Sequence, residues 1–335
     1  MKASHKSMKL PKFSLSKADK KKYRLLFLSA ILLSFTTAII TSAPSIVTLA
    51  ESKVISSANE PLEKPKYLIN DQVQAKKSWI EIVDQKIPSP QFTSGSVLAF
   101  DLDNNRILYE KNSNNRMSPA STTKIMTALV AMEHYQTGDI LVVPAEALVG
   151  GSSMGLTPGE RLTFRSLLYG MLLNSGNDAA YTLAMNYPDG FSAFVARMNQ
   201  KASELGLKNT SFENPAGFDG ANHYSSAQDL AKIAKEAIKN PQLAKIFSTK
   251  EASVISYDQS KSHPLKNLNK LLGEDGITGI KTGFTEKSGE NLVGLVERNG
   301  HMVLTVVLSS SDRFGETKNL IDWIYQNFTW NLRSN

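Results

Sequence analysis

Three short groups of residues in the 335-residue chain have side chains that together could carry out nucleophilic chemistry. They are Ser121-x-x-Lys124, Ser175-Gly176-Asn177 and Lys281-Thr282-Gly283. A serine hydroxyl becomes a good nucleophile only when a base removes its proton. A lysine can be that base only when neutral, so burial or a second cation must lower its pKa. We therefore expect Lys124 to act on Ser121, with Lys281 as the second cation.

Each of these patterns is weak when taken alone. The same spacings occur at Ser14 and Lys17, in Ser57-Ala58-Asn59 and in Lys287-Ser288-Gly289. The local context separates the candidate set from these matches. Ser121 opens a predicted helix, Ser175 lies where one apolar helix ends and another begins, and Lys281 ends a predicted strand. The ordered set of three therefore carries more information than any member.

The helices that must position these residues follow from apolar periodicity. A helix from Ser118 to Met132 places Ser121 and Lys124 one turn apart on the same face. Its N-terminus directs backbone N–H groups at charge that develops on an attacked acyl group. Further helices are predicted at about Phe164–Leu173, Asp178–Met185, Phe191–Leu205 and Ala227–Lys239.

Strands are predicted at both ends of this region. Residues 96–112 form two apolar stretches around Asn104-Asn105, and residues 290–298 and 301–310 flank Asn299-Gly300, so both pairs are predicted hairpins. Residues 277–283 form another strand, and residues 316–328 form a closing helix with Leu320, Ile324 and Phe328 on one face. We expect an α/β (α+β) unit in which N- and C-terminal strands share an antiparallel sheet, flanked by helices, with a central helical lobe.

The three groups, in this order, resemble the Ser-x-x-Lys, Ser-Asp-Asn and Lys-Thr-Gly signature of penicillin-binding proteins and class A β-lactamases. The sequence resembles the D-alanyl-D-alanine carboxypeptidases, which are low-molecular-mass penicillin-binding proteins. The resemblance extends from Ser94 to Phe328 through "TPGERLTFRSLLYGMLLNSGNDAAYTLA", "NPAGFDGANHYSSAQDLAKIA" and "GIKTGFTEKSGENLVG". It implies a β-lactamase/penicillin-binding-like fold.

The resemblance also implies roles and ligands. Ser121 would attack the peptide carbonyl and Lys124 would be the base, while Ser175 would relay a proton to the leaving amine. Asn177 would contact the lysine and the substrate amide, and Lys281 and Thr282 would bind the terminal carboxylate. Gly283 would leave the strand edge open for the substrate backbone. The backbone N–H groups of Ser121 and Phe284 would form the oxyanion hole. The substrate would be a peptidoglycan stem peptide ending in D-Ala-D-Ala, β-lactams would be covalent inhibitors, and no cofactor or metal is expected.

Several alternatives remain at this stage. Arg313 would either meet the carboxylate or lie solvated at the surface, and Phe284 is bulky and would influence specificity for the leaving group. A DD-endopeptidase would use the same residues. A β-lactamase is disfavoured, because Gly176 replaces the aspartate of Ser-Asp-Asn and no Glu-x-x-Leu-Asn segment lies between the second and third groups.

Two other features are not expected to be catalytic. The Gly-x-Ser-x-Gly pattern at residues 151–155 is predicted to be a loop rather than a nucleophile elbow. His223 is expected to be structural.

The N-terminal quarter has a different composition from the rest of the chain. Residues 1–24 hold nine basic residues against Asp19, a net charge of +8 that leaves −1 for the rest of a chain with a total charge of +7. Nucleic-acid binding therefore has little support. Residues 25–50 carry no charge and are long enough to cross a bilayer, which predicts a signal peptide or a signal anchor after a cytoplasmic tail.

The resulting organisation has four parts. Residues 1–24 are the tail, 25–50 the signal peptide or anchor, 51–93 a polar spacer with a short helix around Trp79–Val83, and 94–335 the catalytic domain. The chain has no cysteine and hence no disulfide. Many family members continue after the catalytic domain into a β-rich domain and a terminal membrane helix. We therefore expect the N-terminal segment to hold this enzyme at the outer side of the membrane, unless cleavage releases it to the cell wall.

Overall fold

The computed structural model describes residues 54–55 and 80–332. The predicted tail and apolar segment, residues 1–50, lie outside the described residues, as does most of the predicted spacer. Within the described part of the chain, no helix combines the length and the apolarity needed to cross a membrane. The prediction of a membrane segment therefore stays a prediction.

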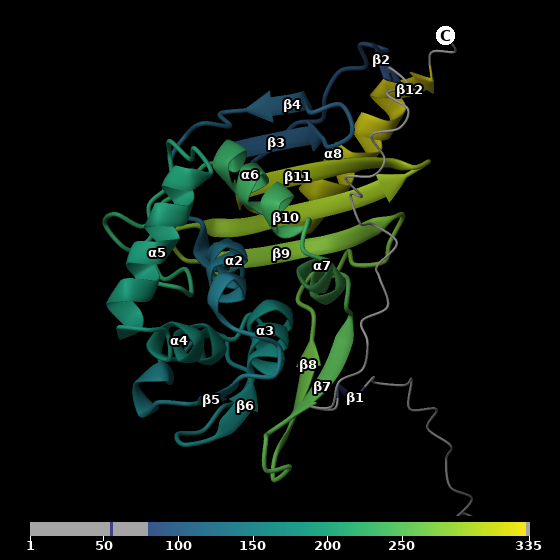
Figure 1. The fold of residues 1–335 in the computed structure, drawn as a ribbon. Coiled ribbons are helices and arrows are strands. Elements are labelled where there is room, and N and C mark those ends of the chain that lie inside the picture. Colours follow the sequence, from purple (N-terminus) through teal and green to yellow (C-terminus); the bar gives the residue numbers. More distant parts are fainter. Residues whose placement is uncertain (1–53, 56–79, 333–335) are drawn as a thin grey trace, which may run out of the picture. The chain divides into compact units, whose positions relative to one another are not determined.

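A five-stranded antiparallel sheet with the order β4-β3-β11-β10-β9 forms the centre of the fold (Figure 1). Its strands are β3 (Ser96–Asp101), β4 (Arg106–Lys111), β9 (Ile277–Thr285), β10 (Gly289–Arg298) and β11 (His301–Ser310). Asn299 and Gly300, between β10 and β11, both have positive φ, as a tight two-residue hairpin turn requires. The sheet thus joins strands from both ends of the domain, which confirms the predicted fold class.

Helices cover both faces of this sheet. Side chains alternate between faces along a strand, so Val97 and Ala99 of β3 pack with α8 (Arg313–Asn327) while Leu98 faces the helical lobe. Strands β10 and β11 lie in the middle of the sheet and are apolar on both faces, which explains their nearly continuous apolar sequences. The buried sheet provides a rigid support for the site at its β9 edge.

The helical lobe lies between the two groups of strands in the chain. It contains α2 (Lys124–His134), α3 (Phe164–Leu173), α4 (Asn177–Met185), α5 (Gly190–Glu204), α6 (Ala227–Ala237) and α7 (Pro241–Phe247). Helix α6 contacts β11 and β3 directly, whereas α3 and α4 lie farther from the sheet than α2 (Figure 1). The Thr163 and Ser226 side chains cap α3 and α6 by accepting backbone N–H groups. The four central helices agree with the predicted ranges.

The predicted helix around Trp79–Val83 is wrong. Residues Ile80–Asp84 form strand β2, which pairs antiparallel with β12 (Phe328–Leu332). The β-branched residues of this segment favour a strand, and its partner lies about 240 residues away, beyond the reach of any local pattern. Paired structure therefore begins inside the segment predicted to be a spacer.

Smaller sheets complete the lobe. Strand β5 (Ile140–Val142) pairs with β6 (Arg161–Thr163), and β7 (Glu251–Ile255) pairs with both β8 (Ser262–Lys266) and the short β1 (Val54–Ile55). Short 3₁₀ turns occur at η2 (Ala120–Thr123) and η3 (Ala145–Ala147). Helix α7 and the β7–β8 hairpin were not predicted from the sequence.

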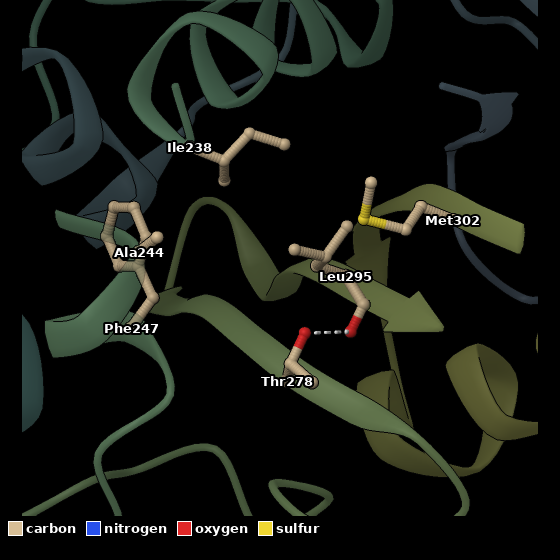
Figure 2. A pocket seen from close by; sticks show the side chains of 6 residues that line it. All are labelled: Ile238, Ala244, Phe247, Thr278, Leu295 and Met302. Atoms are coloured by element: carbon tan, nitrogen blue, oxygen red, sulfur yellow. Dashed lines mark hydrogen bonds between the residues drawn. The ribbon is translucent and has the colours of Figure 1, made fainter. Parts of the chain in front are cut away.

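Two cavities lie away from the predicted site residues. The first has a volume of about 10 Å³, about the space of one water molecule, and is almost entirely apolar (Figure 2). Its lining residues are Ile238, Ala244, Phe247, Thr278, Leu295 and Met302, and the Thr278 hydroxyl donates to the Leu295 carbonyl at 3.5 Å. The second, of about 400 Å³, lies between α6 and the β3–β4 hairpin. Neither cavity includes a residue of the three candidate groups.

Candidate active site

Ser121 lies in the 3₁₀ turn η2, immediately before α2 begins at Lys124. The predicted single helix is therefore a 3₁₀ turn followed by an α-helix, but the two side chains still face each other. Lys124 Nζ lies 2.9 Å from Ser121 Oγ. This separation allows direct proton transfer between them.

The turn that carries Ser121 is held between two glycines from distant segments. A Cβ on Gly217 would lie 1.9 Å from the Ala120 carbonyl oxygen, and Gly217 has a φ of +94°. A Cβ on Gly283 of β9 would lie 3.0 Å from the Pro119 oxygen and 3.1 Å from the Ser121 nitrogen. Any side chain at either position would push the turn away. The glycines thus bring the nucleophile close to the edge strand.

Lys124 is fully buried and its Nζ has two further partners. These are Asn177 Oδ1 at 2.8 Å and the Ala216 carbonyl oxygen at 2.6 Å. Burial lowers the pKa of Lys124 well below its usual value, and the charge of Lys281 lowers it further, while Asp178 acts in the opposite direction. Burial and a neighbouring cation thus both disfavour the charged form of Lys124.

Asn177 begins α4, and the chain reaches it through a constrained junction. Ser175 is 3% exposed and has a φ of +59°, in the left-handed region that non-glycine residues rarely adopt. The Asn177 Nδ2 donates to the Gly150 carbonyl at 2.9 Å, which directs Oδ1 toward Lys124. Among the described residues, the Ser175 hydroxyl makes no hydrogen bond to Ser121 or Lys124. The junction therefore places Ser175 two residues before Asn177, which contacts Lys124.

The β9 edge supplies the third group. Lys281 is 2% exposed, and its Nζ donates to the Thr282 carbonyl at 3.1 Å. Burial, followed by the charge of Arg313, lowers the pKa of Lys281 to about 7. Thr282 is buried, whereas the Phe284 side chain is 54% exposed at the end of the strand. Lys281 is therefore a buried base whose charge depends on pH near neutrality.

Arg313, the first residue of α8, is directed back toward β9. Its Nη1 donates to the Gly283 carbonyl at 2.8 Å, and its backbone N–H donates to Glu290 Oε2 at 3.0 Å. Arg313 also lies over the Phe314 ring. Of the two alternatives left by the sequence, the geometry favours a position beside the site over a solvated surface position.

Sequence reasoning missed the segment that contributes Ala216. The Asn214 Oδ1 accepts the backbone N–H groups of Ala216, Gly217 and Phe218 and forms a tight turn. This turn holds the Ala216 carbonyl against Lys124. Asn214 begins the segment "NPAGFDGANHYSSAQDLAKIA" that resembles the family. A backbone carbonyl that binds a lysine, however, has no side chain by which a sequence could reveal it.

The surroundings of the His223 ring indicate a structural role. Its Nδ1 accepts the Glu213 N–H at 3.0 Å, so the proton is on Nε2, which donates to the Thr123 hydroxyl at 2.9 Å. Burial lowers the pKa of His223 to about 4, so the ring is neutral at pH 7. The ring supports the turn next to Lys124.

Residues 150–156 form a loop, in agreement with the prediction for the Gly-x-Ser-x-Gly pattern. Its carbonyls at Gly150 and Ser152 bind Asn177, the latter by accepting its backbone N–H at 2.7 Å. Sequence reasoning did not connect this loop with the site. In the described part of the chain, no three His, Asp or Glu side chains lie close enough together to hold a metal ion.

The assembled geometry joins a serine, a buried lysine, an amide and two further cations around one edge strand. Such an arrangement can deprotonate the serine, accept an acyl group on it and attract a carboxylate. The fold and site together define a serine acyl-transfer type of centre.

Comparison with known proteins agrees with this class. The sequence profile of the D-alanyl-D-alanine carboxypeptidase family matches residues 83–312. The chain is 36% identical over 243 residues to D-alanyl-D-alanine carboxypeptidase DacF of Bacillus subtilis, covering 70% of this chain and 62% of DacF. It is 33% identical to DacB2 of Mycobacterium tuberculosis, covering 71% of this chain and 84% of that relative. The chain belongs to the D-alanyl-D-alanine carboxypeptidase family.

A solved structure gives the same result at the level of the fold. The DD-transpeptidase of Streptomyces K15 superposes with a TM-score of 0.68 at 29% identity, covering 72% of this chain and 100% of that one. The match to DacF and to DacA of Escherichia coli, at 36% and 32% identity, spans 62% of the length of each relative.

Proposed function

We propose that the protein is a serine-type D-Ala-D-Ala carboxypeptidase that removes the terminal D-alanine from peptidoglycan stem peptides. One observation carries the proposal: the surroundings of Lys124 Nζ suit a neutral amine acting as a base. A neutral amine has two N–H donors and one lone pair. Asn177 Oδ1 and the Ala216 carbonyl can only accept, so they take the two N–H groups. The lone pair then faces the Ser121 hydroxyl.

The first chemical step follows from this arrangement. Ser121 Oγ attacks the carbonyl carbon of the last peptide bond while Lys124 takes the hydroxyl proton. The C–N bond breaks, the proton held by Lys124 passes through Ser175 to the leaving D-alanine amine, and an ester remains on Ser121. Water then attacks the ester and loses a proton to the neutral Lys124 amine. As the bond between Ser121 Oγ and the acyl carbon breaks, Lys124 returns this proton to Ser121 Oγ and the shortened peptide leaves.

The backbone N–H groups of Ser121 and Phe284 are proposed to bind the oxyanion. The close approach of Gly283 to the Ser121 nitrogen supports this role, because it places the backbone after Gly283 next to the nucleophile. Preorganised donors of this kind stabilise the negative charge that develops in the transition state. The Asn177 amide is proposed to contact the substrate as well as Lys124.

The terminal carboxylate of the substrate is assigned to Lys281, Thr282 and Arg313. The charge of Arg313 acts on Lys281 and lowers its pKa, and among the described residues Lys281 forms no ion pair with a carboxylate. A bound carboxylate would supply the missing negative charge. This arrangement favours peptides with a free C-terminus.

The reaction is proposed to take place outside the cytoplasm. Residues 25–50 would act as the membrane anchor or as a cleaved signal, and β-lactams would acylate Ser121 as substrate mimics. Determination of the N-terminus of the mature protein tests this part. An N-terminus at Glu51 would indicate cleavage, whereas retention of the first 50 residues in the membrane fraction would indicate an anchor.

Two assays on the purified chain test the enzymatic proposal. Incubation with a fluorescent penicillin should label the protein stably, and incubation with an N-acylated peptide ending in D-Ala-D-Ala should release D-alanine. Ser121→Ala should abolish both signals, with a circular-dichroism spectrum like that of the wild type as its control. Absence of both signals in the wild type would refute the enzyme, and labelling of Ser121→Ala would refute the nucleophile. Rapid release of the penicillin label would indicate a β-lactamase instead.

A further inference from the structure

We propose that Asp178 is a positioning residue of this site: its buried carboxylate holds the loop of residues 150–156 in the shape that fixes Asn177 against Lys124. The inference rests on the proposed function, because it concerns how the base of that reaction is held. In the described part of the chain, the Asp178 side chain makes no hydrogen bond to Ser121 or Lys124. It acts through its neighbour Asn177.

The Asp178 carboxylate is surrounded by hydrogen-bond donors. Oδ2 accepts the Ser153 hydroxyl at 2.5 Å and the backbone N–H groups of Gly155 and Leu156 at 3.1 and 3.0 Å. The Met154 N–H lies 3.1 Å from Oδ1, and Asp178 is 3% exposed. Every one of these partners donates, which suits the ionised carboxylate. Four successive residues of the loop are thus gathered around one side chain.

The other half of the same loop holds Asn177. The Gly150 carbonyl accepts from Asn177 Nδ2 at 2.9 Å, and the Ser152 carbonyl accepts the Asn177 backbone N–H at 2.7 Å. These two contacts set the orientation of the amide, and so direct Oδ1 to Lys124. Release of the loop from Asp178 would remove the support of both carbonyls.

Gly176 shows how tightly this unit is packed. A Cβ at this position would lie 2.8 Å from Asp178 Oδ1 and 3.2 Å from the Met154 nitrogen. The Gly170 carbonyl would lie 3.1 Å from it on the other side. The loop, the carboxylate and the junction leave no room for a side chain. This explains on physical grounds why the middle residue of the Ser-x-Asn group is glycine here.

The charge of Asp178 gives the role a measurable signature. The charged groups that act on Lys124 are Lys281 from β9 and Asp178 from α4, and the neutral ring of His223 faces the same turn. Asp178 raises the pKa of Lys124, whereas burial and Lys281 lower it. Loss of this charge should therefore move the deprotonation of Lys124 to lower pH. Release of the loop alone leaves Lys124 buried, whereas a general loosening of the fold would admit water to Lys124 and move its deprotonation to higher pH.

Asp178→Asn in the full-length chain separates these possibilities. The rate of acylation by fluorescent penicillin should fall on the order of 10- to 100-fold, because the amide that orients the base is released. The acidic limb of the pH profile of that rate should move to lower pH. A rate within about twofold of the wild type, or a limb displaced to higher pH, would overturn the inference.

Two further variants keep the test decisive. Ser153→Ala removes one contact and retains the charge, so acylation should slow by a smaller factor with an unmoved pH limb, even if Asp178→Asn does not fold. An unchanged rate in Ser153→Ala would overturn the inference.

Asp229→Asn is the matched control, because Asp229 is also buried at the start of a helix and accepts the Asn209 N–H at 2.7 Å, outside the site. If Asp229→Asn lowers the acylation rate and displaces the pH limb as Asp178→Asn does, the inference is also overturned.

These outcomes are distinct from a failure of the proposed function. If the wild type is not acylated at all, the function is wrong and the role of Asp178 in it falls with it. If the wild type is acylated and Asp178→Asn behaves identically, only the positioning role is wrong.

Discussion

The buried basic groups of the candidate active site and the buried carboxylate of Glu316 lie in the same domain but differ in how their charges are met. Lys124, Lys281 and His223 are all at most 2% exposed, and the pKa of each is lowered. Among the described residues, none of the three forms an ion pair. Burial therefore disfavours the charged form of each of them.

Glu316, on α8, is in the opposite situation. Its Oε1 accepts the Thr93 N–H, and its Oε2 accepts the Ser310 hydroxyl at 2.6 Å and the Ser94 N–H at 3.3 Å. Burial acts to raise the pKa of Glu316, but the donors more than offset this, and the pKa lies below its usual value. The charged form is the favoured one, and it ties the segment before β3 to the end of β11 and to α8.

The difference indicates which cluster is organised for stability and which for a ligand. A buried charge with a full set of donors stabilises the fold, whereas a buried base without a counterion lowers stability. Functional sites commonly keep such costs, which other parts of the structure offset. In the proposed complex, the carboxylate of the substrate lies next to Lys281 and supplies the negative charge.

Replacement of Lys124 should separate activity from stability most clearly. Lys124→Met should slow acylation by about 10³- to 10⁴-fold, because the general base is lost. The free energy of unfolding should stay equal or rise by about 1–3 kcal/mol, because an uncompensated basic group becomes an apolar one of similar length. Labelling kinetics and guanidinium titrations measure the two quantities. A variant that is both inactive and clearly less stable would contradict the view that Lys124 is a destabilising functional group.

The neutrality of His223 should be visible in acid. Its pKa is about 4 when folded, against 6.5 for an ordinary histidine, so the unfolded chain binds a proton that the folded chain does not as pH falls from 6.5 to 4. The contribution of His223 to stability is thus complete above pH 6.5 and decreases by about 3 kcal/mol by pH 4. Unfolding titrations at pH 7 and pH 4 should show this loss in the wild type, beyond the loss in His223→Gln. Equal losses in the two proteins would show that the ring is protonated when folded.

The comparison also shows which parts of the site could be read from the sequence. Ser121, Lys124, Asn177 and Lys281 could be brought together because their side chains form ordered patterns on periodic elements. The β10–β11 hairpin was predictable from Asn299-Gly300 and two apolar runs. Burial as a cause of a lowered lysine pKa also followed from chemistry alone.

The rest depends on contacts that have no sequence pattern. The Ala216 and Gly150 carbonyls could not be identified, because every residue has a carbonyl and only the fold selects one. The helix predicted around Trp79–Val83 is instead strand β2, which no local pattern could show because its partner β12 lies at the other end of the domain. The 3₁₀ turn at Ser121 results from packing against Gly217 and Gly283. Such long-range contacts decide local conformation wherever intrinsic preferences are weak.

Removal of the Glu316 charge tests the stabilising side of the comparison. Glu316→Gln should lower the free energy of unfolding by about 2 kcal/mol, because it turns one accepting oxygen into a donor that faces donors. Acylation by penicillin should remain near the wild-type rate. Thermal or guanidinium unfolding measures the first effect, and a labelling time course measures the second. An unchanged stability would place Glu316 among surface charges of little consequence.

The smallest effect concerns the protonation of Lys281. Burial, followed by Arg313, lowers its pKa to about 7, so the free site loses a positive charge as pH rises through neutrality. Binding of a terminal carboxylate should weaken accordingly, and KM for a D-Ala-D-Ala peptide should rise about tenfold between pH 6 and pH 8. The same peptide with a C-terminal amide, which lacks the negative charge, should show no such rise. Equal pH dependence of the two KM values would mean that Lys281 does not bind the carboxylate. A rise in KM only for the peptide with the free carboxylate would show that this carboxylate pairs with the charge of Lys281.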